Sequence, residues 1–165
     1  MALTKIGKEG ITGISNSANA TAITIDSSER ILMPSQPSFF ATGSWSYDAN
    51  YFWKGFGTVD HNIGSHWNNT TGVFTCPIAG RYFIYANVHH HTNNSYHLWG
   101  FAKNGTTING WVQDYNGSQQ GANATSSSLA VNCSANDTLQ FQSNASYANA
   151  YTGANYCVVG AYLLG

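Results

Sequence analysis

The chain has 165 residues, of which 42% are hydrophobic and 14% aromatic, so it is long enough to form one domain with a substantial core. Only 8% of the residues are charged and the net charge is −1, which excludes the basic surface that binding to nucleic acid or to an anionic membrane requires. Helix-forming Glu, Lys and Leu are scarce, whereas Ser, Thr, Asn and Gly are abundant, and this balance predicts an all-β fold.

The first 36 residues differ in composition from the rest. They contain six of the thirteen charged residues, and their apolar side chains are too few to form a core of their own. Short strands are predicted at 22–25 and 31–33, and Pro34 and Pro37 mark a boundary. We expect residues 1–36 to be an extended anchor that is ordered by a partner surface. Its expected contact residues are Ile11, Ile14, Ile23, Ile25 and Ile31.

Residues 37–165 alternate short apolar runs with turn residues, as the strands of a sandwich do. The runs at 81–89 and 156–164 are apolar on both alternating sets, which is typical of strands that are covered on both faces. Asn104-Gly105 is the strongest hairpin signal, and the polar, Gly-rich stretch 114–123 predicts an exposed loop. The other predicted strands are 39–45, 51–56, 73–74, 97–103, 107–112, 127–131 and 138–142.

Three cysteines are present, Cys76, Cys133 and Cys157. Their odd number, and an N-terminus without the apolar stretch of a secretory signal, argue against a disulfide framework, so free buried thiols are expected. The same N-terminus predicts synthesis in a cytoplasm, unless a leader has been removed. Several Asn-x-Ser/Thr sequons resemble a glycoprotein pattern, but without secretion we interpret them as polar loops and strand faces.

The histidines raise the question of a metal site, because His89 and His91 would share one face of a strand and a trimer would bring three copies together. No acidic or cysteine partner stands at a recognised ligand spacing. We therefore predict no metal and no other cofactor, and interpret the histidines as polar residues at strand ends.

Catalysis has little support in the sequence. The carboxylates of the body fall at predicted turns, where Asp is favoured for its backbone hydrogen bonds, and no nucleophile–base motif is present. We predict that the protein is not an enzyme. The carboxylates concerned are Asp48, Asp60, Asp114 and Asp137.

Aromatic residues beside polar stretches are the better candidates for recognition. Rings that combine an apolar face with a polar edge suit sugar or protein surfaces. The stretch 114–123, flanked by aromatic residues, is the preferred recognition surface; the alternative is that these rings pack in the core or at a subunit interface. The predicted ligand-binding residues are Tyr47, Trp53, Tyr96, Trp111 and Tyr115.

Residues 62–83 carry a family resemblance. Thr71-Gly72-Val73-Phe74, then Pro77, then Gly80-Arg81-Tyr82-Phe83 resembles the signature of the C1q-like domain. Later stretches agree with it, although Asn136 replaces the usual glycine before Asp137 and Tyr156 replaces phenylalanine. The resemblance implies a C1q/TNF-like jelly-roll sandwich that forms a homotrimer. The residues expected in its core or threefold interface are Phe74, Tyr82, Ile84, Phe141, Val159, Tyr162 and Leu164.

The anchor resembles a different group of proteins from the rest of the chain. Residues 4–16 and 20–30 are similar to N-terminal segments of tail-fibre and appendage proteins of marine bacteriophages. This resemblance implies a virion-surface fibre, on the tail or on the capsid, which docks on other virion proteins and presents its domain to a glycan or outer-membrane component of the host. A secreted C1q-like lectin and a purely structural capsid decoration remain as alternatives.

Overall fold

The computed structural model describes residues 24–25, 27–28, 31–33, 35–90, 95–108, 110–116, 123–147 and 157–164. Its internal contacts separate the chain into two units, Met1–Ser35 and Gln36–Gly165, and we call the second unit the head.

The described residues of the first unit form one strand pair. β1 (Thr24–Ile25) and β2 (Ile31–Leu32) are antiparallel, with Ile25 opposite Ile31, and both fall within the predicted strand ranges. Three of the five expected anchor residues lie outside the described residues, namely Ile11, Ile14 and Ile23. The anchoring role of this unit therefore stays a prediction.

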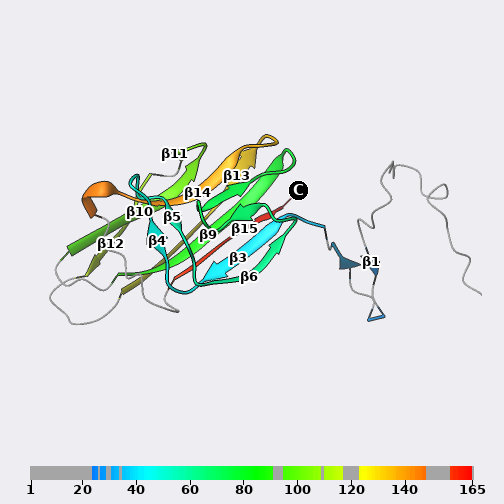
Figure 1. The fold of residues 1–165 in the computed structure, drawn as a ribbon, viewed down its shortest axis with the longest axis horizontal. Coiled ribbons are helices and arrows are strands. Elements are labelled where there is room, and N and C mark those ends of the chain that lie inside the picture. The colour runs from blue at the N-terminus through cyan, green and yellow to red at the C-terminus, as the bar shows by residue number, and fades with distance from the viewer. Residues whose placement is uncertain are drawn as a thin grey trace, which may run out of the picture. The chain divides into compact units, whose positions relative to one another are not determined.

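The head is a sandwich of two antiparallel sheets (Figure 1). One sheet has five strands in the order β13-β9-β15-β3-β6, and the other has six, in the order β7-β8-β14-β10-β11 with β12 also paired to β10. The first comprises β3 (Ser38–Thr42), β6 (Thr58–Ile63), β9 (Gly80–His90), β13 (Asn123–Cys133) and β15 (Val158–Leu163). The second comprises β7 (Trp67–Asn68), β8 (Val73–Thr75), β10 (Ser95–Lys103), β11 (Thr106–Thr107), β12 (Val112–Asn116) and β14 (Thr138–Ser143).

Two short elements complete the described part of the head. A hairpin of β4 (Ser46–Tyr47) and β5 (Trp53–Lys54) lies between β3 and β6 in sequence, and a 3-10 turn, η2 (Ala145–Tyr147), follows β14. Among the described residues, no helix is long and apolar enough to span a bilayer. The prediction of an all-β sandwich is confirmed.

Alternating burial along the strands builds an aromatic core. Tyr82 and Ile84 of β9 point inward, as does Phe141 of β14, and all three are fully buried. Phe39 of β3 stacks on Trp67 of β7, with 4.2 Å between ring centroids and 4° between ring planes. Phe39 also meets the ring of Phe141 edge-on at 6.3 Å. Aromatic contacts thus join the two sheets directly.

The signature stretch serves the fold. The side-chain amide of Asn62 donates to the carbonyl of Trp67 at 2.8 Å and accepts from its N–H at 3.0 Å, which fixes the turn before β7. Gly72 has a φ of 68° and lies so close to β5 that a Cβ there would stand 1.7 Å from the carbonyl oxygen of Trp53. Only glycine fits both the positive φ and this backbone approach.

The hairpin at Asn104-Gly105 is confirmed. It joins β10 to β11, and its two turn residues have φ values of 51° and 75°, as a type I′ turn requires. The prediction of an exposed loop at 114–123 is wrong for its first part, because β12 extends to Asn116 and pairs with β10. Residues 117–122 of that loop lie outside the described residues.

All four carboxylates of the head were predicted to lie at turns, and two of them do. Asp48 accepts from the N–H groups of Asn50 and Phe52, and Asp137 accepts from that of Ser134. The other two predictions are wrong, since both residues lie in strands that pair with a neighbour, β6 and β12. They are Asp60 and Asp114.

Candidate binding surfaces

The outer face of the five-stranded sheet carries four aromatic side chains, which we call the aromatic face. Along their strands they alternate with buried core residues, so they point away from the core. The ring of Phe83 lies 5.3 Å from that of Tyr162 and 6.1 Å from that of Tyr85, between centroids. Tyr162 is 39% exposed. The aromatic face consists of Phe40, Phe83, Tyr85 and Tyr162.

Small residues surround these rings. Gly160 is buried because the Tyr85 ring covers it: a Cβ at position 160 would stand 2.3 Å from the Tyr85 hydroxyl oxygen. Ser128 and Ala130 of β13 lie opposite Tyr85 and Phe83, so a shallow depression runs beside the rings. Burial first, and then the neighbouring Tyr162, raise the pKa of Tyr85. The phenol therefore stays neutral at physiological pH.

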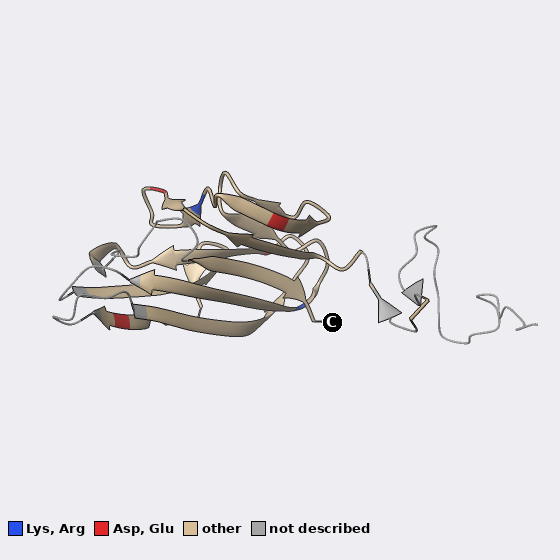
Figure 2. Cartoon of the chain, turned by 90° about the horizontal axis from the view of Figure 1, so that it is seen from below, with Lys and Arg blue, Asp and Glu red and all other residues tan. Residues whose placement is uncertain are grey.

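The aromatic face is poor in charge, and one buried polar atom beside it lacks a partner among the described residues. Strands β3, β9, β13 and β15 contain one charged residue, Arg81, near the start of β9. Figure 2 shows how few charged positions the described chain carries. Beside the rings, the buried Oδ1 atom of Asn87 has no hydrogen-bond partner within the described chain. A buried oxygen without a donor is costly in an isolated protein.

The residues predicted for the core or the threefold interface divide into two groups. Tyr162 and Leu164 are exposed by 39% and 48%, as interface residues are before association. The others are buried inside the single chain: Phe74, Tyr82, Ile84, Phe141 and Val159. Phe40, Phe83 and Tyr85, which are half-buried on the outer face, were not among the predicted site residues. The observation that the run 81–89 is apolar on both sets was the signal that could have found the last two.

A second aromatic surface lies on the outer face of the six-stranded sheet. Tyr96 of β10 stands directly opposite Tyr115 of β12, with 4.5 Å between ring centroids, and the two residues are 41% and 45% exposed. We call these two residues the tyrosine pair. Gln113, on the same face as Tyr115, is exposed beside it, and Trp111, just before β12, is exposed as well. Three predicted ligand-binding residues are thus accessible, and two of them are in ring contact.

The other two predicted ligand-binding residues lie on the β4–β5 hairpin. Tyr47 is exposed, and its ring lies 5.3 Å from that of Tyr51. The prediction for Trp53 is wrong: its side chain is fully buried, and its indole N–H donates to Ser143 Oγ at 2.8 Å. Alternation explains the error, because neighbouring strand residues face opposite sides and the polar loop beside Trp53 did not reveal which side was core.

Ser143 belongs to a buried polar group that the sequence did not reveal. Its Oγ lies 3.2 Å from Nε2 of His97, and His97 stands opposite Asp114 in the β10–β12 register. Ser, His and Asp are the residues of a catalytic triad, but Ser143 and His97 are buried and the hydroxyl already accepts from Trp53. This arrangement orders the core and offers no access to a substrate.

The described residues contain no group of three His, Cys, Asp or Glu side chains that could hold a metal ion. His89 is partly buried in β9, whereas the side chain of His90 and the whole of His91 lie outside what the structure describes. The metal hypothesis raised by these histidines therefore gains no support from His89 or His97.

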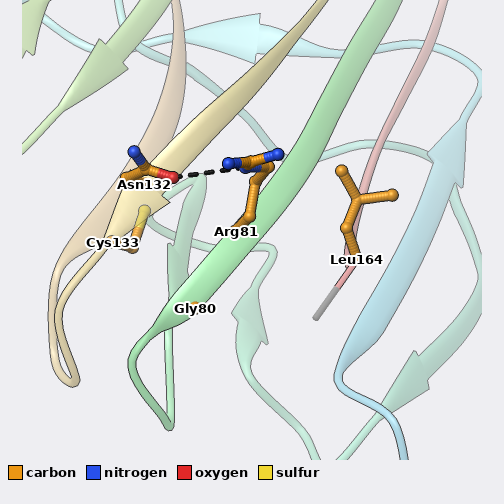
Figure 3. A pocket seen from close by; sticks show the side chains of 5 residues that line it. All are labelled: Gly80, Arg81, Asn132, Cys133 and Leu164. Atoms are coloured by element: carbon orange, nitrogen blue, oxygen red, sulfur yellow. Dashed lines mark hydrogen bonds between the residues drawn. The ribbon is translucent and has the colours of Figure 1, made fainter.

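A pocket lies at one end of the five-stranded sheet, between β9, β13 and the last residues of the chain (Figure 3). The Arg81 side chain points across it and donates from Nε to Asn132 Oδ1 at 3.4 Å. Cys133, 7% exposed, and Leu164 form its other walls. The pocket is open, and among the described residues that line it Arg81 is the one charged group, so they offer no second charge to fix a ligand.

Comparisons with known proteins agree with this geometry. The sequence model of one family, described as C1q domain, matches residues 39–164. Among solved structures, the globular domain of zebrafish complement 1qA protein superposes with a TM-score of 0.59 at 16% identity, covering 78% of this chain and 98% of that one. Murine APRIL superposes with a TM-score of 0.56 at 12% identity, covering 78% and 99%. No curated protein matches the chain. The predicted C1q/TNF-like sandwich is confirmed at the level of the fold.

Proposed function

Because this chain belongs to the C1q domain family, with residues 39–164 forming the domain, we propose that it is a non-enzymatic binding protein whose heads associate as a homotrimer and contact a host surface. One observation carries the proposal: the aromatic face lies on the outer side of the sheet with Tyr162 exposed, its other rings only partly buried, and almost no charge among its strands. Exposed apolar surface of this kind marks an association site. Three copies meeting through it would bury Tyr162 and enclose Asn87.

The oligomeric state of the full chain tests this assembly. We expect sedimentation equilibrium to give three times the chain mass, and Phe83→Asp or Tyr162→Asp to give monomers, because a charge would be buried at the interface. Tyr115→Asp places the same charge on the other sheet and should leave the trimer intact. A wild-type monomer would refute the proposed assembly, and so would a trimer that survives both substitutions on the aromatic face.

For recognition we propose the tyrosine pair together with Trp111. Their half-exposed rings provide apolar surface for the C–H faces of sugars, and Gln113 beside them provides hydrogen bonds without charge, so neutral glycans fit best. Three weak sites on one trimer would add up to useful avidity. Tyr47 is a further exposed candidate on the hairpin.

Binding to an array of bacterial surface glycans tests the recognition site. Tyr96→Ala and Tyr115→Ala should each lower apparent affinity by about tenfold, the scale of losing one aromatic contact per head in a multivalent complex. Ile78→Ala removes another exposed apolar side chain and should change nothing. If wild type and variants bind equally, the tyrosine pair is not the site; if no glycan is bound, the purely structural role is favoured.

We further propose that the protein is a bacteriophage virion appendage, on the tail or the capsid, anchored by residues 1–36. The support is the similarity of the N-terminal segment to phage fibre proteins and the low charge of the chain. Immunogold imaging of purified virions with an antibody against the head should label the particle surface. A cleaved leader on the mature protein, with unlabelled virions, would instead support the secreted lectin.

A further inference from the structure

Two of the three cysteines lie against each other between the two sheets. Cys76 follows β8, in the six-stranded sheet, and Cys133 is the last residue of β13, in the five-stranded sheet. Both side chains belong to the same buried core cluster, and each thiol shifts the pKa of the other, as close neighbours do. Both thiols are free and buried in this structure. Cys157 is also free and buried, but it lies directly before β15, a different strand of the head.

The backbone holds the two cysteines in place independently of their thiols. The N–H of Cys76 donates to the carbonyl of Asp137 at 2.8 Å, and the N–H of Asn136 donates to the carbonyl of Cys76 at 2.7 Å. These bonds tie Cys76 to the turn that begins directly after Cys133. Asp137 closes that turn by accepting from the N–H of Ser134 at 2.8 Å. The pairing of β8 with β14 therefore holds the backbone of Cys76 beside the turn that follows Cys133.

We propose that Cys76 and Cys133 form an intrachain disulfide under oxidising conditions, which would join the two sheets and close a loop containing β9 to β13. The odd number of cysteines does not oppose this, because Cys157 is the one left over. The proposal revises the expectation of three inert thiols. The pairing could not be read from the sequence, since the two cysteines are far apart in the chain and only the β13–β14 turn brings them together.

The reaction can proceed by exchange with a low-molecular-weight disulfide such as oxidised glutathione. Cys133 borders the open pocket of Figure 3, so it is the thiol that an oxidant meets first. Its thiolate attacks the small disulfide, forming a mixed disulfide and releasing one small thiol. The deprotonated Cys76 then attacks the sulfur of Cys133, forming the intrachain bond and releasing the second small thiol. The two cysteines lose two electrons in total, and the oxidant gains them.

The surroundings of the two thiols bear on how fast they can be oxidised. Burial raises the pKa of Cys133, although a hydrogen bond from Cys76 and the charge of Lys103 oppose the shift. Burial, and then the neighbouring Cys133, raise the pKa of Cys76 far above its ordinary value. Thiolates are scarce as a result, so oxidation should be slow at neutral pH and faster in alkaline buffer.

The test uses the full chain, reduced and then incubated with oxidised glutathione. After unfolding and alkylation, mass spectrometry should find one alkylated cysteine instead of three, and proteolysis should yield a peptide that joins Cys76 to Cys133. We expect oxidation to raise the melting temperature of wild type and of Cys157→Ala, the matched control, because the loop constrains the unfolded chain. It should not do so in Cys76→Ala or Cys133→Ala.

Three outcomes would overturn the proposal: three alkylated thiols after oxidation, a stable mixed disulfide on Cys133, or a cross-link that includes Cys157. The peptide map of the wild-type chain decides between them without any variant, so poor folding of an alanine variant would leave the test intact. The proposal is independent of the virion role and of the trimer. If the protein is assembled in a reducing cytoplasm and released by lysis, the bond would form only after release.

Discussion

Several polar side chains of the head form hydrogen bonds that hold the backbone of its loops in place. Asn69 and Asn104 both begin sequons, yet their amides are engaged inside the protein. Asn69 accepts from the N–H of Phe56 and donates to its carbonyl, and Asn104 donates to Asp137 at 2.8 Å and accepts from the N–H of Thr138 at 2.8 Å. Polar residues that satisfy loop backbone in this way agree with their interpretation as structural.

At the residue scale, two glycines with similar φ values allow two costs of substitution to be measured separately. One is the cost of a left-handed backbone, and the other is the cost of a steric clash. Gly72 and Gly105 have φ values of 68° and 75°, but only position 72 faces the backbone of Trp53, whereas position 105 opens to space. Gly105→Ala should cost about 1 kcal/mol for the left-handed conformation alone. Gly72→Ala should cost about 1–3 kcal/mol more, the scale of overpacking a core.

Urea unfolding of both variants measures this difference. Equal losses would show that β5 moves aside without cost, and would contradict the close approach that the structure places at Gly72.

At the scale of elements, one carboxylate joins two turns. Asp137, in the β13–β14 turn, accepts from Asn104 and from Lys103 of the β10–β11 hairpin, each at 2.8 Å. Together with the N–H of Ser134, these donors lower the pKa of Asp137 from its ordinary 3.8 to about 2. A carboxylate with a lowered pKa stabilises the fold above its unfolded-state pKa and loses that effect as the pH falls through the folded-state value.

We therefore expect Asp137→Asn to lower the melting temperature by a constant amount between pH 5 and pH 7. The difference from wild type should shrink below about pH 4 and be lost as the pH falls through the folded-state pKa of about 2. Thermal unfolding monitored by circular dichroism across this range provides the measurement, with Asp60→Asn, on an exposed strand position, as control. A difference that is independent of pH down to 2 would mean that the charge of Asp137 is not what holds the turns together.

At the scale of the whole molecule, low charge shapes how the head associates. Four strands of the five-stranded sheet share a single charged residue, and the aromatic face lies on their outer side. Burial of apolar surface does not weaken as salt screens charges, whereas contacts between ions do. The proposed trimer should thus depend on the rings and very little on electrostatics.

We expect the trimer to keep its mass when salt is raised from about 0.1 M to about 1 M, although the screening length falls from roughly 10 Å to 3 Å over that range. Sedimentation velocity at both concentrations tests this expectation. Dissociation in high salt would indicate that Arg81 or another charged group holds the subunits together, and would move the interface away from the aromatic face.

The sequence by itself determined whatever depends on neighbours along the chain. Alternation and turn residues predicted the all-β sandwich, Asn104-Gly105 predicted its hairpin, and residues 62–83 indicated the family, because turn geometry and strand period are local properties. Tertiary structure decided the rest. It buried Trp53 while exposing Tyr47, placed Tyr96 against Tyr115, and brought Cys76 to Cys133. Which face a ring turns to, and which distant residues meet, depend on strand register and sheet packing, and these are settled only when both sheets close on one core.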